Sequence, residues 1–168
     1  MAHEARGRSD PAVTDSKPCV YTVGHGLLDQ DELLELLRRH GVDTIIDVRS
    51  QPHSVRAPQF NREALERLRA VKYRWMPALG GRPPAHLRVA GSDAPDYERM
   101  AREPDTSKAL DEIAALAEQR SVALMCSESR PEACHRSRML EPELARRGVW
   151  VEHILHSGEA AAVPTLFA

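Results

Sequence analysis

The sequence predicts an α/β fold: a single domain with a mostly parallel, open sheet of about five strands and helices on both faces. Two observations carry this prediction. Short apolar, β-rich runs alternate with longer segments whose apolar residues recur at helical spacing. The chain has 168 residues, enough for one substantial core, and a second domain would need more sequence.

The first half of the chain predicts three strands and two helices. The strands are short runs rich in β-branched, aromatic or other apolar residues: Cys19–Val23, Thr44–Val48 and Lys72–Met76. Between the first two, a leucine stripe from Leu27 to Leu37 predicts an amphipathic helix that Asp29 caps and Gly41 ends. Asn61–Ala70 predicts a second, shorter helix before the third strand.

A stretch rich in proline and glycine, residues 80–104, follows the third predicted strand. Tyr97–Ala101 predicts one helical turn within it. Segments this long without regular structure are often functional, so we expect a lid over a site.

The remaining elements continue the alternation: helix Thr106–Gln119, strand Val122–Met125, helix Ser137–Arg147 and strand Trp150–Leu155. Thr106 or Ser107 can cap the first of these helices. Pro142 has no amide hydrogen to donate, so we expect the second helix to kink or restart near Glu141. Residues 157–168 form a tail of uncertain order.

Composition limits the classes of function. With 23 basic and 25 acidic side chains, the net charge of −2 creates no general attraction to nucleic acid or membrane. Residues 1–17 are polar and predict a disordered tail before the α/β domain at 18–156. Because this tail lacks the apolar stretch of a secretory signal and no apolar run could cross a bilayer, we expect a cytoplasmic protein. The three cysteines favour reduced thiols over a disulfide framework.

Four polar clusters follow predicted strands: Gly24-His25-Gly26, Arg49-Ser50 with His53 and Ser54, Gly80-Gly81-Arg82, and Cys126 to Arg136. Parallel strands bring their carboxyl ends to one edge of a sheet, where ligands bind in open α/β folds. We therefore expect the four clusters to share a cleft.

Cys126 carries the sharpest chemical hypothesis. A thiol at a strand end, facing a helix N-terminus and several arginines, should ionise more readily than a free cysteine and act as a nucleophile. His25 and Glu128 would then transfer protons. The alternative is a small, buried, unreactive side chain that ends the strand. Cys134 is a candidate for capping the helix or for resolving an oxidised Cys126.

Arginines in the same clusters indicate an anionic ligand. Arg49 offers a planar fork for phosphate or carboxylate, although Asp47 could instead hold it in a structural ion pair. Arg136 lies at the predicted start of a helix, where backbone amides also attract anions, and is our candidate anion clamp. Other residues of the same clusters complete the predicted substrate-binding set: Ser50, Gly80, Gly81, Cys134 and His135.

Spacing argues against two familiar sites. A phosphatase loop of the protein-tyrosine type needs arginine six positions after its cysteine, where this chain has Glu132. Zinc ligation by Cys126, Cys134, His135 and perhaps His25 is chemically possible, but the paired C-x2-C spacing of structural sites is missing. We therefore predict no metal site, and the sequence identifies no cofactor.

Seven short motifs occur in order along the chain: YTVGHG (Tyr21–Gly26), DVRSQPHS (Asp47–Ser54), QFN (Gln59–Asn61), LGG (Leu79–Gly81), MCSES (Met125–Ser129), CHRSR (Cys134–Arg138) and VEHI (Val151–Ile154). In this combination the chain resembles the domain of unknown function 488 family, over roughly Val20–Ile154. The resemblance implies an α/β domain whose cysteines, histidines and arginines form a site. It implies no particular reaction.

The sequence thus favours an enzyme that binds an anionic, nucleotide-like or phosphorylated small molecule at the carboxyl ends of the strands, with thiol chemistry at Cys126. A second hypothesis is a nucleic-acid-binding or processing module that uses a phosphate track of arginines: Arg56, Arg62, Arg74, Arg82 and Arg88. A third is a redox sensor in which Cys126 and Cys134 form a reversible disulfide.

Overall fold

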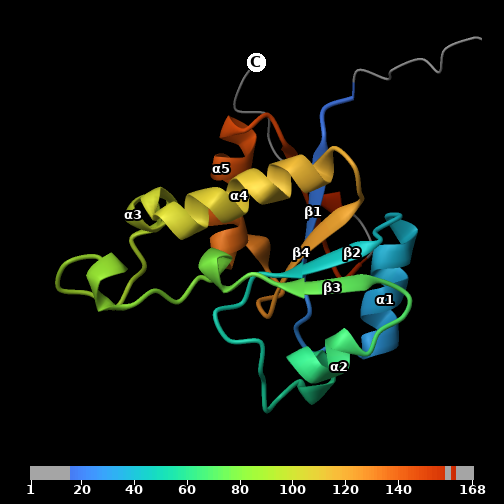
Figure 1. Ribbon diagram of the computed structural model, residues 1–168. Coiled ribbons are helices and arrows are strands. Elements are labelled where there is room, and N and C mark those ends of the chain that lie inside the picture. The colour runs from blue at the N-terminus through green and yellow to red at the C-terminus, as the bar shows by residue number, and fades with distance from the viewer. Residues whose placement is uncertain (1–15, 158–159, 162–168) are drawn as a thin grey trace, which may run out of the picture.

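Six strands form one sheet in the order β3-β2-β4-β1-β5-β6 (Figure 1). Their bounds are β1 Cys19–Gly24, β2 Thr44–Asp47, β3 Lys72–Trp75, β4 Val122–Cys126, β5 Trp150–Ile154 and β6 Ala160–Ala161. The first five strands are parallel, and the two-residue β6 pairs antiparallel with β5. The predicted α/β fold with a mostly parallel sheet of about five strands is confirmed.

This computed structural model describes residues 16–157 and 160–161. The tails predicted at 1–17 and 157–168 therefore fall mostly outside the described residues.

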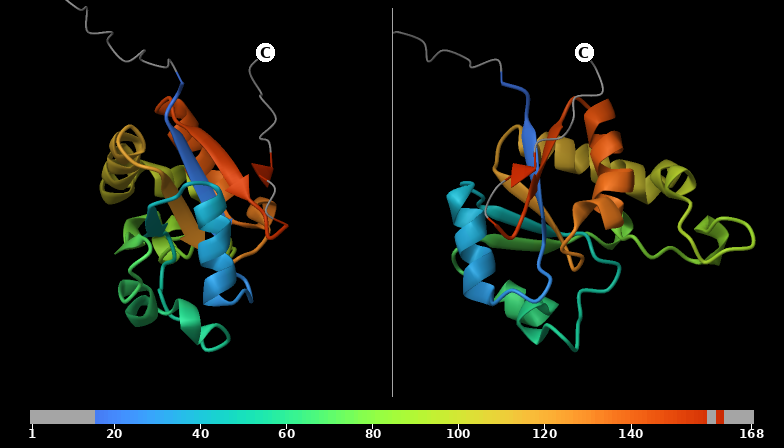
Figure 2. Two further views of the ribbon diagram at one scale, coloured as in Figure 1. Left: turned by 90° about the vertical axis from the view of Figure 1, so that its right-hand side faces the viewer. Right: turned by 180° about the vertical axis from the view of Figure 1, so that it is seen from behind.

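Helices cover both faces of the sheet (Figures 1 and 2). On one face α1 (Gln30–Arg39) and α2 (Arg62–Glu66) pack against side chains such as Ile45 and Met125. On the other face lie α3 (Tyr97–Arg102), α4 (Pro104–Ala117) and α5 (Glu141–Arg146), which pack against side chains such as Leu124. Successive strand residues alternate between these two cores, because side chains in a strand point to opposite faces.

The central strand β4 is buried at all of its positions, because it has a parallel neighbour on each side and a helical layer on each face. Its register aligns Cys126 with Gly24 of β1, and Met125 with Asp47 of β2. The carboxyl ends of β1, β2 and β4 therefore meet at one edge, as predicted for the polar clusters.

Local sequence signals explain how the helices begin and end. Asp29 and Glu32 form a capping box at the start of α1, and Gly41 after its end has a φ of +65°, which glycine adopts without a steric penalty. The predicted interruption near Glu141 is confirmed. A π-helical turn, Arg136–Leu140, runs into α5, which restarts at Glu141 beside Pro142.

Two predicted helix boundaries differ from the structure. The helix expected over 61–70 is only the short α2, although Asn61 is indeed its N-cap residue. The helix expected to start at Thr106 or Ser107 already begins at Pro104, because proline lacks the amide that a first helical residue leaves unpaired. Thr106 is instead buried and donates a hydrogen bond to the carbonyl of Ala78 (2.9 Å).

The stretch 80–104 contains more regular structure than expected. It holds a 3-10 turn at Ala85–Leu87, a β-bridge between Arg88 and Pro95, and α3, which confirms the predicted turn at Tyr97–Ala101. The middle of the stretch projects away from the body of the protein in Figure 1 and in the right-hand view of Figure 2. In this structure its two ends contribute to the wall of the site rather than forming a cover.

Within the described part of the chain, no helix has the length and apolar character needed to span a membrane.

Candidate functional site

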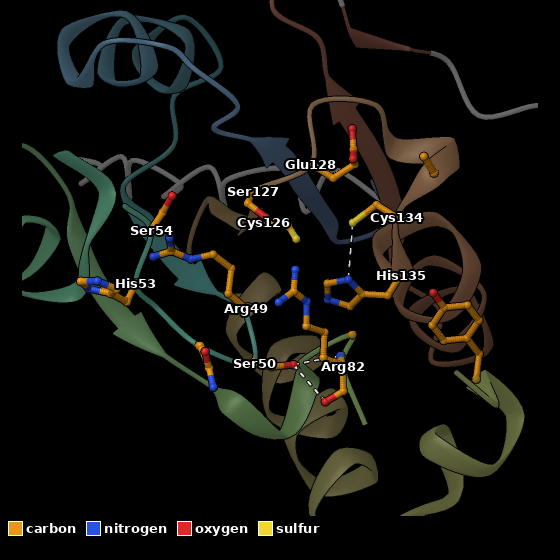
Figure 3. Close-up of a pocket in the computed structure, with 14 residues that line it drawn as sticks. Arg49, Ser50, His53, Ser54, Arg82, Cys126, Ser127, Glu128, Cys134 and His135 are labelled. Carbon is orange, nitrogen blue, oxygen red and sulfur yellow. Dashed lines mark hydrogen bonds between the residues drawn. The ribbon is translucent and has the colours of Figure 1, made fainter. Parts of the chain in front are cut away.

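A pocket of about 370 Å³ lies at the carboxyl edge of the sheet (Figure 3). Its wall combines residues from three of the four predicted polar clusters. Seven of the predicted site residues line it: Arg49, Ser50, Gly81, Cys126, Glu128, Cys134 and His135. His25, Gly80 and Arg136 do not line it, and each instead supports a residue that does.

Arg49 is held rigidly at the pocket wall. Its side chain is 5 % exposed, and Asp47, wholly buried, accepts hydrogen bonds from Nε (2.9 Å) and Nη2 (2.6 Å). Nη2 also donates to the carbonyl of Phe60 (2.7 Å), and Tyr73 donates its hydroxyl hydrogen to Asp47 (2.7 Å). The ion pair weighed from the sequence is therefore present. This ion pair does not exclude a ligand role for Arg49, because Asp47 and Phe60 do not occupy Nη1.

His25 lies behind Arg49 rather than in the pocket. Its ring stacks on Phe60, Nδ1 donates to the carbonyl of Gly26 (2.9 Å), and Nε2 accepts from Nη1 of Arg49 (3.3 Å). Burial, together with the neighbouring Arg49 cation, lowers the pKa of His25 to about 4. A neutral His25 therefore orients Arg49, and the structure does not place it to exchange protons with a pocket ligand.

Four of the five N–H groups of Arg49 have partners among the described residues, which leaves one at Nη1. Arg49 can therefore offer a ligand a single directed hydrogen bond, not the bidentate fork expected from the sequence.

Arg136 is completely buried beneath the pocket. Nε donates to the sulfur of Cys134 (3.3 Å), Nη1 donates to the hydroxyl of Thr22 (3.2 Å), and Nη2 donates to the carbonyl of Glu128. The predicted anion clamp is thus unavailable to a ligand in the pocket. The guanidinium points back into the protein because the π-helical turn directs it toward β1 and the loop after β4.

The two pocket cysteines differ in acidity, and the difference is opposite to our prediction. The pKa of Cys134 is lowered to about 6, first by the neighbouring Cys126 thiol and then by the Arg136 cation beside it. The pKa of Cys126 is raised to about 11 by the neighbouring Cys134 sulfur and by burial. The expectation that Cys126 ionises more readily than a free cysteine is therefore wrong, and Cys134 is the more acidic thiol.

His135 completes a compact group with the two sulfurs. Its Nδ1 lies 3.4 Å from the sulfur of Cys134, and its Nε2 donates to the carbonyl of Val48 (3.0 Å). One ligand atom each from Cys126, Cys134 and His135 lie within 4.8 Å of one another. We call these three residues the sulfur–imidazole cluster.

The glycines of the site make close approaches possible. A Cβ atom on Gly81 would lie 2.6 Å from Nδ1 of His135, and one on Gly80 would lie 2.3 Å from the hydroxyl of Ser50. That hydroxyl accepts a hydrogen bond from the amide of Arg82 (2.9 Å). Gly80 and Gly81 therefore shape the wall rather than contact a ligand by themselves.

Arg82 is a pocket residue that our predicted set omitted. Its exposed side chain reaches toward Cys126 and His135 in Figure 3, and it makes no side-chain hydrogen bond or ion pair with the described residues. The signal was present in the sequence, since Arg82 directly follows the glycine pair in the third polar cluster. Tyr97, from the far end of the same stretch, also lines the pocket. It carries no comparable sequence signal, because only the fold of residues 80–97 brings it there.

Glu128 lies at the rim. Its exposed carboxylate accepts a hydrogen bond from the amide of Arg130 (3.2 Å) and points away from the sulfurs in Figure 3. The structure therefore gives Glu128 no contact with the sulfur–imidazole cluster.

The family model described as Domain of unknown function DUF488 matches residues 29–141, more than half of the chain. The chain belongs to this family. The DUF488 match begins just before α1 and ends at the start of α5, so it includes the Arg49 loop, the glycine pair and the sulfur–imidazole cluster. It does not extend to His25. Comparison with curated proteins and with solved structures found no match.

Proposed function

We propose that this DUF488 protein is an enzyme that binds a small anionic molecule, nucleotide-like or phosphorylated, in the pocket at the carboxyl edge of the sheet. One observation carries the proposal. The guanidinium of Arg82, which has no acidic partner among the described residues, faces the sulfur–imidazole cluster across the pocket (Figure 3). An anion held by Arg82 would have its neighbouring atoms beside the most reactive groups of the protein.

Other groups in the pocket wall support an anionic ligand. Arg49 contributes one N–H that has no partner among the described residues, although buried Asp47 balances its charge. Hydroxyl groups of Ser50, Ser54 and Ser127 can also donate to anionic oxygens. Glu128 is the one carboxylate among the lining residues, so repulsion of an anion is small.

In the metal-free protein we assign the expected thiol chemistry to Cys134 instead of Cys126. Its thiolate is favoured at neutral pH, and Cys126 retains its proton. Cys134 would therefore be the nucleophilic sulfur when no metal ion is bound, with His135 as its nearest imidazole.

The nucleic-acid alternative has less support. Three arginines of the suggested track are paired with carboxylates: Arg62 with Glu66, Arg74 with Glu112, and Arg88 with Asp93. These pairs reduce the positive potential that a phosphate backbone would require.

A thiol redox sensor is the second candidate, because the sulfurs of Cys126 and Cys134 belong to one cluster less than 5 Å across. Mild oxidation should then reduce the intact mass by two hydrogen atoms and link the two cysteine peptides. A product in which each sulfur is oxidised separately would dispose of this candidate.

The enzyme proposal is tested by comparing an anionic and a neutral alkylating reagent on metal-free protein. If the pocket attracts anions, iodoacetate should modify Cys134 faster, relative to iodoacetamide, than it modifies free cysteine. We expect the gain to be about tenfold, since a hydrogen bond to a charged group contributes about 1.5–3 kcal/mol. Inorganic phosphate should slow the reaction, and compounds that protect Cys134 are then assayed for turnover.

Arg82→Gln should abolish this preference without loss of stability, because the side chain makes no hydrogen bond with the described residues. Arg69→Gln, an exposed arginine outside the pocket wall, is the matched control. Equal relative rates on the protein and on free cysteine, with no effect of Arg82→Gln, would remove the support for an anion pocket.

A further inference from the structure

We propose that the sulfur–imidazole cluster binds a zinc ion through Sγ of Cys126, Sγ of Cys134 and Nδ1 of His135, with the fourth coordination position open to the pocket. The sequence alone argued against a metal site, because the cysteines lack the C-x2-C spacing. Folding brings the end of β4 and the start of the π-helical turn together, which the spacing does not reveal.

The distances suit tetrahedral zinc. Bonds of about 2.3 Å to sulfur and 2.0–2.1 Å to nitrogen place two sulfurs about 3.8 Å apart, and a sulfur and a nitrogen about 3.6 Å apart. The sulfur of Cys134 and Nδ1 of His135 are 3.4 Å apart, and all three donor atoms lie within 4.8 Å of one another. Binding would therefore require only small side-chain adjustments.

The imidazole is oriented for metal binding by its outer contact. A carbonyl can only accept, so Nε2 of His135 must donate its hydrogen to the carbonyl of Val48. In the neutral ring this leaves the lone pair of Nδ1 directed toward the sulfurs. Metal-binding histidines usually have such a contact on the nitrogen that faces away from the ion.

The buried Arg136 guanidinium requires a negative charge nearby. Among the described residues its hydrogen-bond partners are a sulfur, a hydroxyl and a carbonyl, and it has no carboxylate partner. A wholly buried cation without an anionic partner is costly, so the Cys134 thiolate is the group that balances it. The N–H of Arg136 would also stabilise this thiolate as a zinc ligand.

The open position distinguishes this site from a structural zinc site. No fourth His, Cys, Asp or Glu donor joins the cluster in the described ranges 16–157 and 160–161, and all three cluster residues line the pocket. Three protein ligands with a fourth position for water or substrate are typical of catalytic zinc. Two thiolates and an imidazole also favour zinc over magnesium or calcium, which prefer oxygen ligands.

Metal titration of the full-length, chelator-treated protein tests this assignment. Cobalt(II) should bind with one equivalent and produce the sulfur-to-cobalt charge-transfer absorption of a thiolate site, and zinc should displace it. Cys126→Ser, Cys134→Ser and His135→Gln should each weaken zinc binding by more than about 100-fold. Cys19→Ser and His53→Gln are matched controls, because Cys19 lies outside the pocket and His53 lines it without joining the cluster. Both should bind zinc as the wild type does.

A second measurement uses only the wild-type protein and so does not depend on the folding of the variants. One equivalent of zinc should slow alkylation of Cys126 and Cys134 at least tenfold and leave Cys19 unaffected. The assignment is overturned by the absence of the charge-transfer band, by unchanged affinity in folded cluster variants, or by equal alkylation with and without zinc. Phosphate protection of the metal-free protein is measured separately, so the anion pocket can stand if the zinc site fails.

Discussion

Because His25 is buried and neutral, we predict that the free energy of unfolding decreases at acidic pH by an amount that can be calculated from its pKa. Its ring is 2 % exposed, stacks on Phe60 and lies beside the Arg49 cation, so protonation within the fold is unfavourable. The pKa falls from 6.5 to about 4 on folding. Because the folded pKa is the lower one, the unfolded chain binds the proton first. The stability associated with neutral His25 is therefore complete above pH 6.5 and is lost as the pH falls toward 4.

The size of this effect follows from the two pKa values. At pH 5 most unfolded chains carry the proton and most folded molecules do not, which lowers the free energy of unfolding by about 2 kcal/mol relative to pH 7.5. Urea unfolding at a series of pH values measures this loss. In His25→Gln the side chain cannot titrate, so about 2 kcal/mol of the acid sensitivity should disappear.

Comparison with the wild type separates His25 from the other acid-sensitive groups, which both proteins share. His86→Gln is the matched control, because His86 is an exposed histidine. It should retain the wild-type dependence on pH. Parallel stability curves for wild type and His25→Gln between pH 7.5 and 5 would refute this account of His25.

Three further substitutions have defined outcomes. Gly24→Ala would place a Cβ atom 1.8 Å from the backbone oxygen of Glu128, so we expect a loss of about 3 kcal/mol in the free energy of unfolding; wild-type stability in urea would contradict this clash. Arg136→Met removes a buried cation that makes three hydrogen bonds, so denaturant unfolding should show a loss of about 3–5 kcal/mol, and a loss below 1 kcal/mol would show that this network contributes little. Gly81→Ala should displace His135 and weaken zinc binding about tenfold, as measured by competition with a chelator. Unchanged zinc affinity would contradict the close contact between residue 81 and the His135 ring.

Strand and helix positions were predictable because they depend on local patterns. The β-branched run before Val48 and the capping signals at Asp29 and Gly41 each specify structure within a few residues. Pro142 likewise specified the restart of the last helix. The short α2 was less predictable, since a few apolar residues cannot show where tertiary packing will end a helix.

The grouping of polar clusters at one edge was also predictable, because parallel strands align their carboxyl ends whatever side chains they carry. The sequence by itself thus determined the fold class, the edge that holds the pocket and the presence of cysteine, histidine and arginine there. Only the tertiary structure decided which of these side chains enter the pocket. Arg136 turns inward to pair with Cys134, whereas Arg82 extends into the open pocket.

The same distinction applies to acidity. Cys126 ends an apolar strand, whereas Cys134 directly precedes His135 and Arg136. Their pKa values separate because the two sulfurs lie in one cluster and only Cys134 accepts the N–H of Arg136. Such directions depend on how the end of β4 and the π-helical turn fold back against each other, which the spacing of these residues does not reveal.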